Sequence, residues 1–409
     1  MPGDFRPETF RGAEGFFCAG QDQAGRWWLI EPGGRPFFCK AVQGVRATPA
    51  DPGDHDGTPT SAIDPAVRLR RWGFNAVGAG GDGAGCADGL AFMAAVDFCR
   101  AGAPIVAPGV RLPDVFDPDW PRLAAARAAD VCAPLASSRE LLGWLAGDGS
   151  GWAQPAAADS SARPGRPTLL QICLSLEPGF VAFHAAWEFV LALHGGQLES
   201  LARAWGVPLA NREVVRERTR AEQGLATRGY LRDDARWSRE FARRYFTSTA
   251  AAIRAADPNH LLLGGRFAGP VGASVLAECV YPAVDVALCD WRELPAAGAP
   301  SAGPVLAGNV GWADEAFHAA PATGSAWRLT SVERMLRRGR AALVRAARHP
   351  AVAGYVWGQW LDEPGEQPPF ARGLVHANGA EAREHTELLT EFNFRADIMR
   401  SAAPQTVSP

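Results

Sequence analysis

Residues 349–364, HPAVAGYVWGQWLDEP, contain one short, continuous apolar run at 352–360 that ends just before Asp362 and Glu363. A segment with helical spacing of its apolar residues, 332–349, precedes the run. Strands that are buried on both faces of a parallel sheet are continuous apolar runs of this kind. The segment therefore predicts a helix followed by a buried parallel strand.

The same pattern recurs along the whole chain. Seven further apolar runs, each ending in Gly, Pro or polar residues, predict strands at 37–43, 75–80, 104–110, 141–148, 260–267, 284–290 and 304–309. Helical patterns lie between them at 65–72, 89–101, 120–133 and 237–257. Strands that alternate with helices indicate parallel β-α units, and eight of them favour a closed barrel over an open doubly wound sheet. The predicted fold is α/β, a (β/α)8 TIM barrel.

Two additions to the barrel are predicted. Residues 25–40 form a hairpin around the turn signal at 31–34, EPGG, and lead into the first strand. The stretch after the fourth strand is too long for a simple loop, and we expect a helical insertion, residues 160–236, over the barrel mouth. The whole chain, 1–409, is predicted to be one barrel domain.

Composition restricts the partners. The net charge of −3 and the pI near 6.3 provide no basic surface, which argues against nucleic acid or an anionic membrane as partner and favours a small molecule. The first residues lack the charged and apolar regions of a signal peptide, so a cytoplasmic location is expected. The eight cysteines have no CxxC spacing and the histidines no HxH or HExxH spacing, so we expect no metal and no cofactor.

Catalytic residues of α/β barrels lie at the carboxyl ends of the strands. Three carboxylates near predicted strand ends are candidates for a general acid or base: Asp148, Asp290 and Glu363. Burial in an apolar, tryptophan-rich barrel mouth would raise the pKa of such a carboxyl group.

Six further strand-end residues are candidates for binding the substrate: Arg46, Arg266, Asn309, Trp357, Gln359 and Trp360. The two arginines suit a carboxylate or hydroxyl groups, or they form structural salt bridges. The two tryptophans suit the flat face of a sugar or of another ring, or they are packing residues.

Six segments resemble, in order, segments of clan-A glycoside hydrolases of the β-agarase and β-galactosidase-like type. They are GRWWLIEPGGRPFF (25–38), LRRWGFNAV (69–77), LLGWLAGDGSGW (141–152), FVLALHGGQLESLARAWGV (189–207), AADPNHLLLGGRF (255–267) and HPAVAGYVWGQWLDEP (349–364). The resemblance implies a catalytic barrel with an acid/base Glu after the fourth strand and a nucleophilic Glu after the seventh. This chain has Gly149 and Asn309 at those positions, and Asp148 matches the Asn that precedes the acid/base.

Neither Gly149 nor Asn309 can protonate a leaving group or attack a sugar, so the resemblance alone suggests a pseudoglycosidase. Three hypotheses follow. The barrel catalyses a non-hydrolytic acid/base reaction on a small metabolite, such as cyclisation, dehydration or isomerisation. Alternatively, it is a glycoside hydrolase with displaced carboxylates, with Asp148 as the acid and Asp314 or Glu315 near the seventh strand. Finally, it is a binding protein without catalysis.

Overall fold

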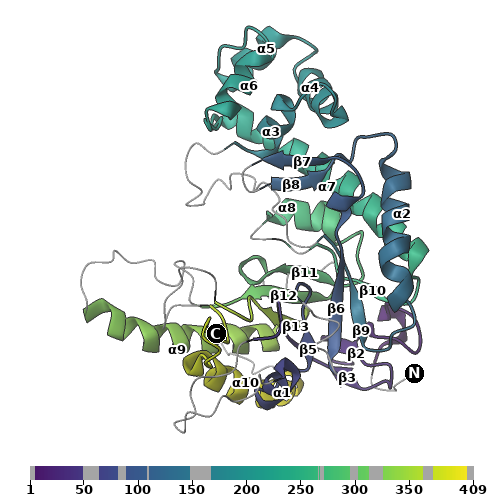
Figure 1. The fold of residues 1–409 in the computed structure, drawn as a ribbon, viewed down its shortest axis with the longest axis vertical. Coiled ribbons are helices and arrows are strands. Elements are labelled where there is room, and N and C mark those ends of the chain that lie inside the picture. The colour runs from purple at the N-terminus through teal and green to yellow at the C-terminus, as the bar shows by residue number, and fades with distance from the viewer. Residues whose placement is uncertain are drawn as a thin grey trace.

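The computed structural model describes residues 5–48, 64–81, 89–107, 110–147, 167–265, 267, 271–294, 303–312, 326–362 and 372–402. Eight parallel strands form one sheet in the spatial order β10-β9-β6-β5-β4-β13-β12-β11 (Figure 1). Along the chain they are β4 (Cys39–Val42), β5 (Ala76–Val77), β6 (Ala91–Val96), β9 (Leu141–Ala146), β10 (Leu261–Leu262), β11 (Ala287–Asp290), β12 (Val305–Val310) and β13 (Val352–Trp357).

The two end strands of this sheet, β10 and β11, meet through backbone contacts. The N–H of Leu288 donates to the carbonyl of Leu263 at 2.9 Å, and the N–H of Asp285 donates to the carbonyl of Leu262 at 2.9 Å. Strand order therefore runs once around the sheet and returns to its start. The predicted (β/α)8 barrel is confirmed.

The third barrel strand was predicted at the wrong place. Residues 89–101, expected to be a helix, form strand β6 and the 3-10 helix η2 (Phe98–Arg100). Residues 104–110, expected to be the strand, lie largely in a separate antiparallel pair, β7 (Pro104–Ala107) with β8 (Val110–Pro113). A short, entirely apolar run is compatible with a buried strand or a buried helix, and here the pairing of β6 with β5 and β9 decides for the strand.

Five helices accompany the strands: α1 (Pro65–Arg71), α2 (Trp120–Cys132), α7 (Arg228–Ala256), α9 (Ala326–Arg348) and α10 (Arg383–Ser401). Local sequence sets two of their starts. At the start of α1, the carboxylate of Asp64 accepts a hydrogen bond from the N–H of Ala66, and Pro65 is the first helical residue. At the start of α7, the hydroxyl of Thr227 accepts a hydrogen bond from the N–H of Tyr230. Aromatic residues of α7 recur at helical spacing and are buried, so one face of this long helix packs on the protein.

Between β9 and α7 the chain forms α3 (Leu169–Ser175), α4 (Val181–Leu193), α5 (Leu198–Trp205) and α6 (Glu213–Arg220). In Figure 1 these helices lie together at one end of the molecule, beyond β7 and β8. The buried carboxylate of Asp233 on α7 anchors the ends of α4 and α5, because it accepts hydrogen bonds from Nε2 of His194 at 2.6 Å and Nε1 of Trp205 at 2.9 Å. The predicted helical insertion after the fourth strand is present.

The N-terminal part forms a small antiparallel sheet of β1 (Cys18–Gln21), β2 (Trp27–Ile30) and β3 (Pro36–Phe37), after the short helix η1 (Pro7–Thr9). The turn between β2 and β3 is closed by the N–H of Gly34, which donates to Glu31 O at 2.7 Å. This confirms the predicted hairpin. The remaining short helices are η3 (Ala133–Leu135), α8 (Ala273–Val275), the π-helix η4 (Leu276–Val280) and η5 (Trp291–Glu293). None of the described helices is long and apolar enough to cross a membrane.

Candidate active site at the carboxyl ends of the strands

Side chains from the ends of three strands line a small cavity at the barrel mouth. Gln43 follows β4, Asp290 ends β11, and Asn309 lies near the end of β12. The cavity has a volume of about 10 Å³. A space of roughly 10–15 Å³ is the lower limit for one water molecule. The strand ends thus surround a space close in size to a single water molecule, which these three polar side chains line together with Phe267, Leu288 and Cys289.

Asp290 is the best-anchored carboxylate of this group. Its side chain is fully buried, and its Oδ1 and Oδ2 accept Nε and Nη2 of Arg292 at 2.8 and 2.9 Å. Oδ1 also accepts the backbone N–H of Arg292 at 2.9 Å and so caps η5. A paired, two-point contact with a guanidinium holds a carboxylate in one orientation. Asp290 is therefore a fixed negative charge beneath the barrel mouth.

Asn309 has an unusual backbone conformation, with φ of 51°, and the pairing of β12 with β13 shifts register between Ala307 and Val310. Asn tolerates this left-handed region better than most residues. Its Nδ2 donates to the carbonyl of Phe267 at 2.9 Å and to Oδ2 of Asp290 at 3.3 Å. The amide is thereby oriented with its nitrogen toward Asp290 and its oxygen on the other side.

The turn that follows Asp290 contains a second acidic group, Glu293. Burial raises the pKa of this half-buried carboxyl group, whereas the N–H groups of Val271 and Gly272, which it accepts at 3.0 and 2.7 Å, lower it. Because its two carboxylate oxygens each accept a backbone N–H, Glu293 holds Val271 and Gly272 in place just before α8. The neighbouring thiol of Cys289 has its pKa raised to about 12 by burial, so it is protonated at neutral pH.

Asp97 is a strand-end carboxylate that the sequence prediction missed. It follows β6 directly, caps η2 by accepting the N–H of Cys99 at 3.0 Å, and pairs with Arg100 at 3.1 Å. Arg111, which directly follows the segment 104–110 predicted as the third strand, lies on β8, and its Nη1 is 3.7 Å from Oδ2 of Asp97. Correct placement of the third strand over residues 91–96 would have identified this carboxylate.

Several predicted site residues cannot be placed. Asp148, Arg266 and Glu363 lie outside the described residues. Arg46 is exposed, and Gln359 is partly exposed beyond the end of β13. Of the predicted site residues, Asp290 and Asn309 therefore lie together around one cavity, which Gln43 also lines. The roles predicted for the other residues stay predictions.

The two predicted ligand-binding tryptophans are buried. Trp357 is 1% exposed, packs at 4.5 Å between ring centroids against Trp312, and donates from Nε1 to the carbonyl of Arg372 at 3.1 Å. Trp360 is 0% exposed and lies 5.7 Å from the ring of Trp72. This favours the packing interpretation for both indoles.

Comparisons with known proteins agree with this architecture. No protein-family model matches the chain. Beta-agarase A of Vibrio sp. (strain JT0107) is 27% identical over 227 residues, which cover 49% of this chain and 21% of that protein. The match thus spans about a fifth of the length of this curated relative.

Solved structures similar to the chain cover nearly all of it. PfGH50B superposes with a TM-score of 0.62 at 17% identity over 96% of this chain and 68% of that one. An exo-beta-agarase superposes with a TM-score of 0.60 at 18% identity, over 96% of this chain and 67% of the agarase. BpGH50 superposes with a TM-score of 0.61 at 15% identity, over 98% of this chain and 85% of BpGH50. The chain therefore has the glycosidase-like barrel fold of these proteins.

Proposed function

We propose that the chain hydrolyses a glycosidic bond in an agarose-derived oligosaccharide and does so with inversion at the sugar carbon. One observation carries the proposal. Asp290 and Asn309, at the ends of adjacent strands β11 and β12, are joined by a hydrogen bond and face a cavity of about 10 Å³ where barrel enzymes have their active sites. The similarity of the fold and of part of the sequence to agarases supports the choice of substrate.

Inverting hydrolysis suits this arrangement because it requires no nucleophilic carboxylate at the position of Asn309. One carboxylate acts as general base on a water molecule, and a second carboxyl group protonates the leaving oxygen. Asp290 is the base in our proposal. Its charge is oriented by Arg292, and the amides of Gln43 and Asn309 would hold the water beside it.

The acid must come from another strand. Asp148 is our candidate, since it is the next residue after Gly147, whose N–H donates at 2.9 Å to Val96 O at the end of β6. The oxocarbenium-like transition state gains stabilisation from a negative charge that is already fixed in place before the reaction. The carboxylate of Asp290 supplies that charge.

A hydrolysis assay with two matched variants tests the proposal. The purified protein is incubated with agarose-derived oligosaccharides, and 1H NMR identifies the anomer that is formed first. Asp290→Asn should lower the rate by about 10² to 10⁴, the usual scale for loss of a general base. Asp97→Asn removes a carboxylate that also ends a strand, caps a short helix and pairs with arginine, and it should retain activity within about threefold.

Retention of anomeric configuration, or full activity of Asp290→Asn beside an inactive Asp97→Asn, would contradict the assignment of Asp290. A folded wild type that binds these oligosaccharides without cleaving them would instead favour the non-hydrolytic or non-catalytic alternatives. Asn309 in place of a nucleophile is the specific observation in favour of those alternatives.

A further inference from the structure

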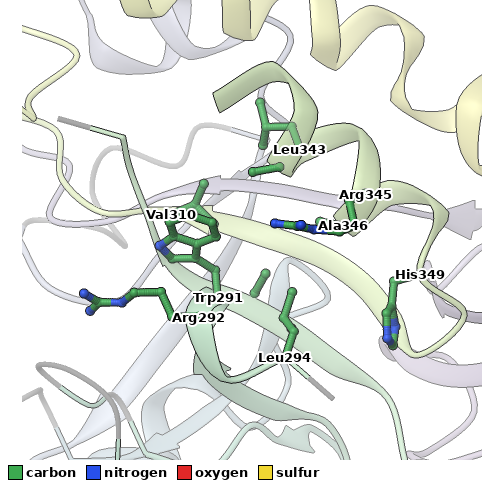
Figure 2. A pocket seen from close by; sticks show the side chains of 10 residues that line it. Trp291, Arg292, Leu294, Val310, Leu343, Arg345, Ala346 and His349 are labelled. Carbon is green, nitrogen blue, oxygen red and sulfur yellow. The ribbon is translucent and has the colours of Figure 1, made fainter. Parts of the chain in front are cut away.

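A second cavity lies on the outer wall of the barrel. In a (β/α)8 barrel the helix after each strand covers the outer face of the sheet. Between β11 and β12 the described residues contain only the short helix η5. A groove of about 470 Å³ occupies the space between η5, β12 and α9 (Figure 2).

The walls of this groove are mainly apolar. Ala307 and Val310 of β12 form one side, and Leu343 and Ala346 of α9 form another. The partly exposed indole of Trp291 lies opposite α9, with Val310 close beside it in Figure 2. A flat apolar group can therefore lie between an aromatic ring and aliphatic side chains.

The charged groups around the groove are basic. Figure 2 shows the guanidinium of Arg345 extending from α9 across the groove toward Trp291 and Val310. Arg345 is exposed, and no carboxylate in the described part of the chain pairs with it. Arg292 also lines the groove, but its guanidinium is committed to Asp290. His349 lies at the far end.

We propose that this groove binds a small organic anion with a flat apolar body, such as an aromatic carboxylate. Its volume falls within the range of about 300–1,000 Å³ that is usual for small-molecule sites. Trp291 and the aliphatic wall would take the ring, and Arg345 would pair with the carboxylate. This site lies outside the barrel wall and is separate from the proposed catalytic cavity, although Arg292, which orients Asp290, borders the groove.

Isothermal titration calorimetry with a matched pair of probes tests the site. The probes are 2-naphthoate and the uncharged 2-naphthylmethanol. We expect one naphthoate per chain, bound about tenfold more tightly than the alcohol. Arg345→Gln should lower the affinity for naphthoate to that of the alcohol and leave the alcohol unchanged. Arg348→Gln is the matched control, since Arg348 is also exposed on α9 but does not line the groove.

A second variant keeps the charge and fills the space. Ala342 lines the groove and is partly exposed, so Ala342→Trp should abolish binding of both probes while circular dichroism and the melting temperature remain those of the wild type. Absence of naphthoate binding in the wild type would overturn the proposal. Equal losses in Arg345→Gln and Arg348→Gln would do so as well, as would unchanged binding by a folded Ala342→Trp.

Discussion

Nδ2 of Asn309 lies 3.3 Å from Oδ2 of Asp290, and this hydrogen bond joins the ends of strands β11 and β12. An amide nitrogen faces the carboxylate at the position where the family resemblance implies a nucleophilic carboxylate. Two carboxylates at this distance would repel each other when both are ionised. The amide of Asn309 avoids this repulsion and donates a hydrogen bond to Asp290 instead.

Asn309→Asp should therefore destabilise the protein in a pH-dependent way. At pH 7 the new carboxylate faces Asp290, and we expect the free energy of unfolding to fall by roughly 1–3 kcal/mol. Near pH 4 one of the two groups can hold a proton, so the loss should shrink. Urea unfolding at both pH values measures it. Asn309→Ala removes the hydrogen bonds and adds the strain of a left-handed backbone at Ala, but it introduces no charge, so as the control it should show a loss that depends much less on pH.

Titration of Asp234 on α7 should lower the free energy of unfolding as the pH rises. Burial raises its pKa to about 6, although the Thr168 hydroxyl and the N–H of Leu170 act in the opposite direction. A raised folded-state pKa gives stability that is complete below the unfolded value, about 3.9, and is lost as pH rises through about 6.

The stability of the wild type relative to Asp234→Asn should accordingly fall between pH 4 and pH 7, by up to about 3 kcal/mol. Denaturant titrations of both proteins across this range provide the measurement. A constant difference between them would show that the carboxyl group titrates normally.

Trp357 separates the packing and ligand-binding interpretations. If it is a packing residue, Trp357→Ala leaves a cavity against Trp312 and should cost about 3–5 kcal/mol of unfolding free energy. Phe394 is 65% exposed on α10, so Phe394→Ala should change stability by less than about 1 kcal/mol. Normal stability of Trp357→Ala together with weaker oligosaccharide binding would restore the ligand-binding interpretation.

Gly354 of β13 is required by close packing of strands. A Cβ atom at this position would overlap the backbone oxygen and the side chain of Cys39 on β4. Gly354→Ala should therefore destabilise the barrel by at least about 3 kcal/mol or prevent soluble expression. Gly33→Ala is the control, because a Cβ atom there meets nothing within 4 Å. Equal melting temperatures of the two variants would contradict the register in which β4 and β13 pair.

Most of the order of strands and helices could be predicted from the sequence alone, with the third barrel strand as the exception. Continuous apolar runs separated by helical patterns identified seven of the eight barrel strands, and Pro65 and the turn at 31–34 marked local boundaries through their backbone preferences. Asp290 and Asn309 followed as site candidates, since they end two of those strands.

Tertiary structure decided what short apolar segments and side chains do. Residues 91–96 form a strand because β5 and β9 flank them, and that pairing is not encoded in their own periodicity. Trp357 and Trp360 are buried against Trp312 and Trp72, although their strand-end position alone fitted an exposed role equally well. The hydrogen bond between Asp290 and Asn309 and the groove beside Arg345 arise only when residues distant in sequence meet around the closed barrel.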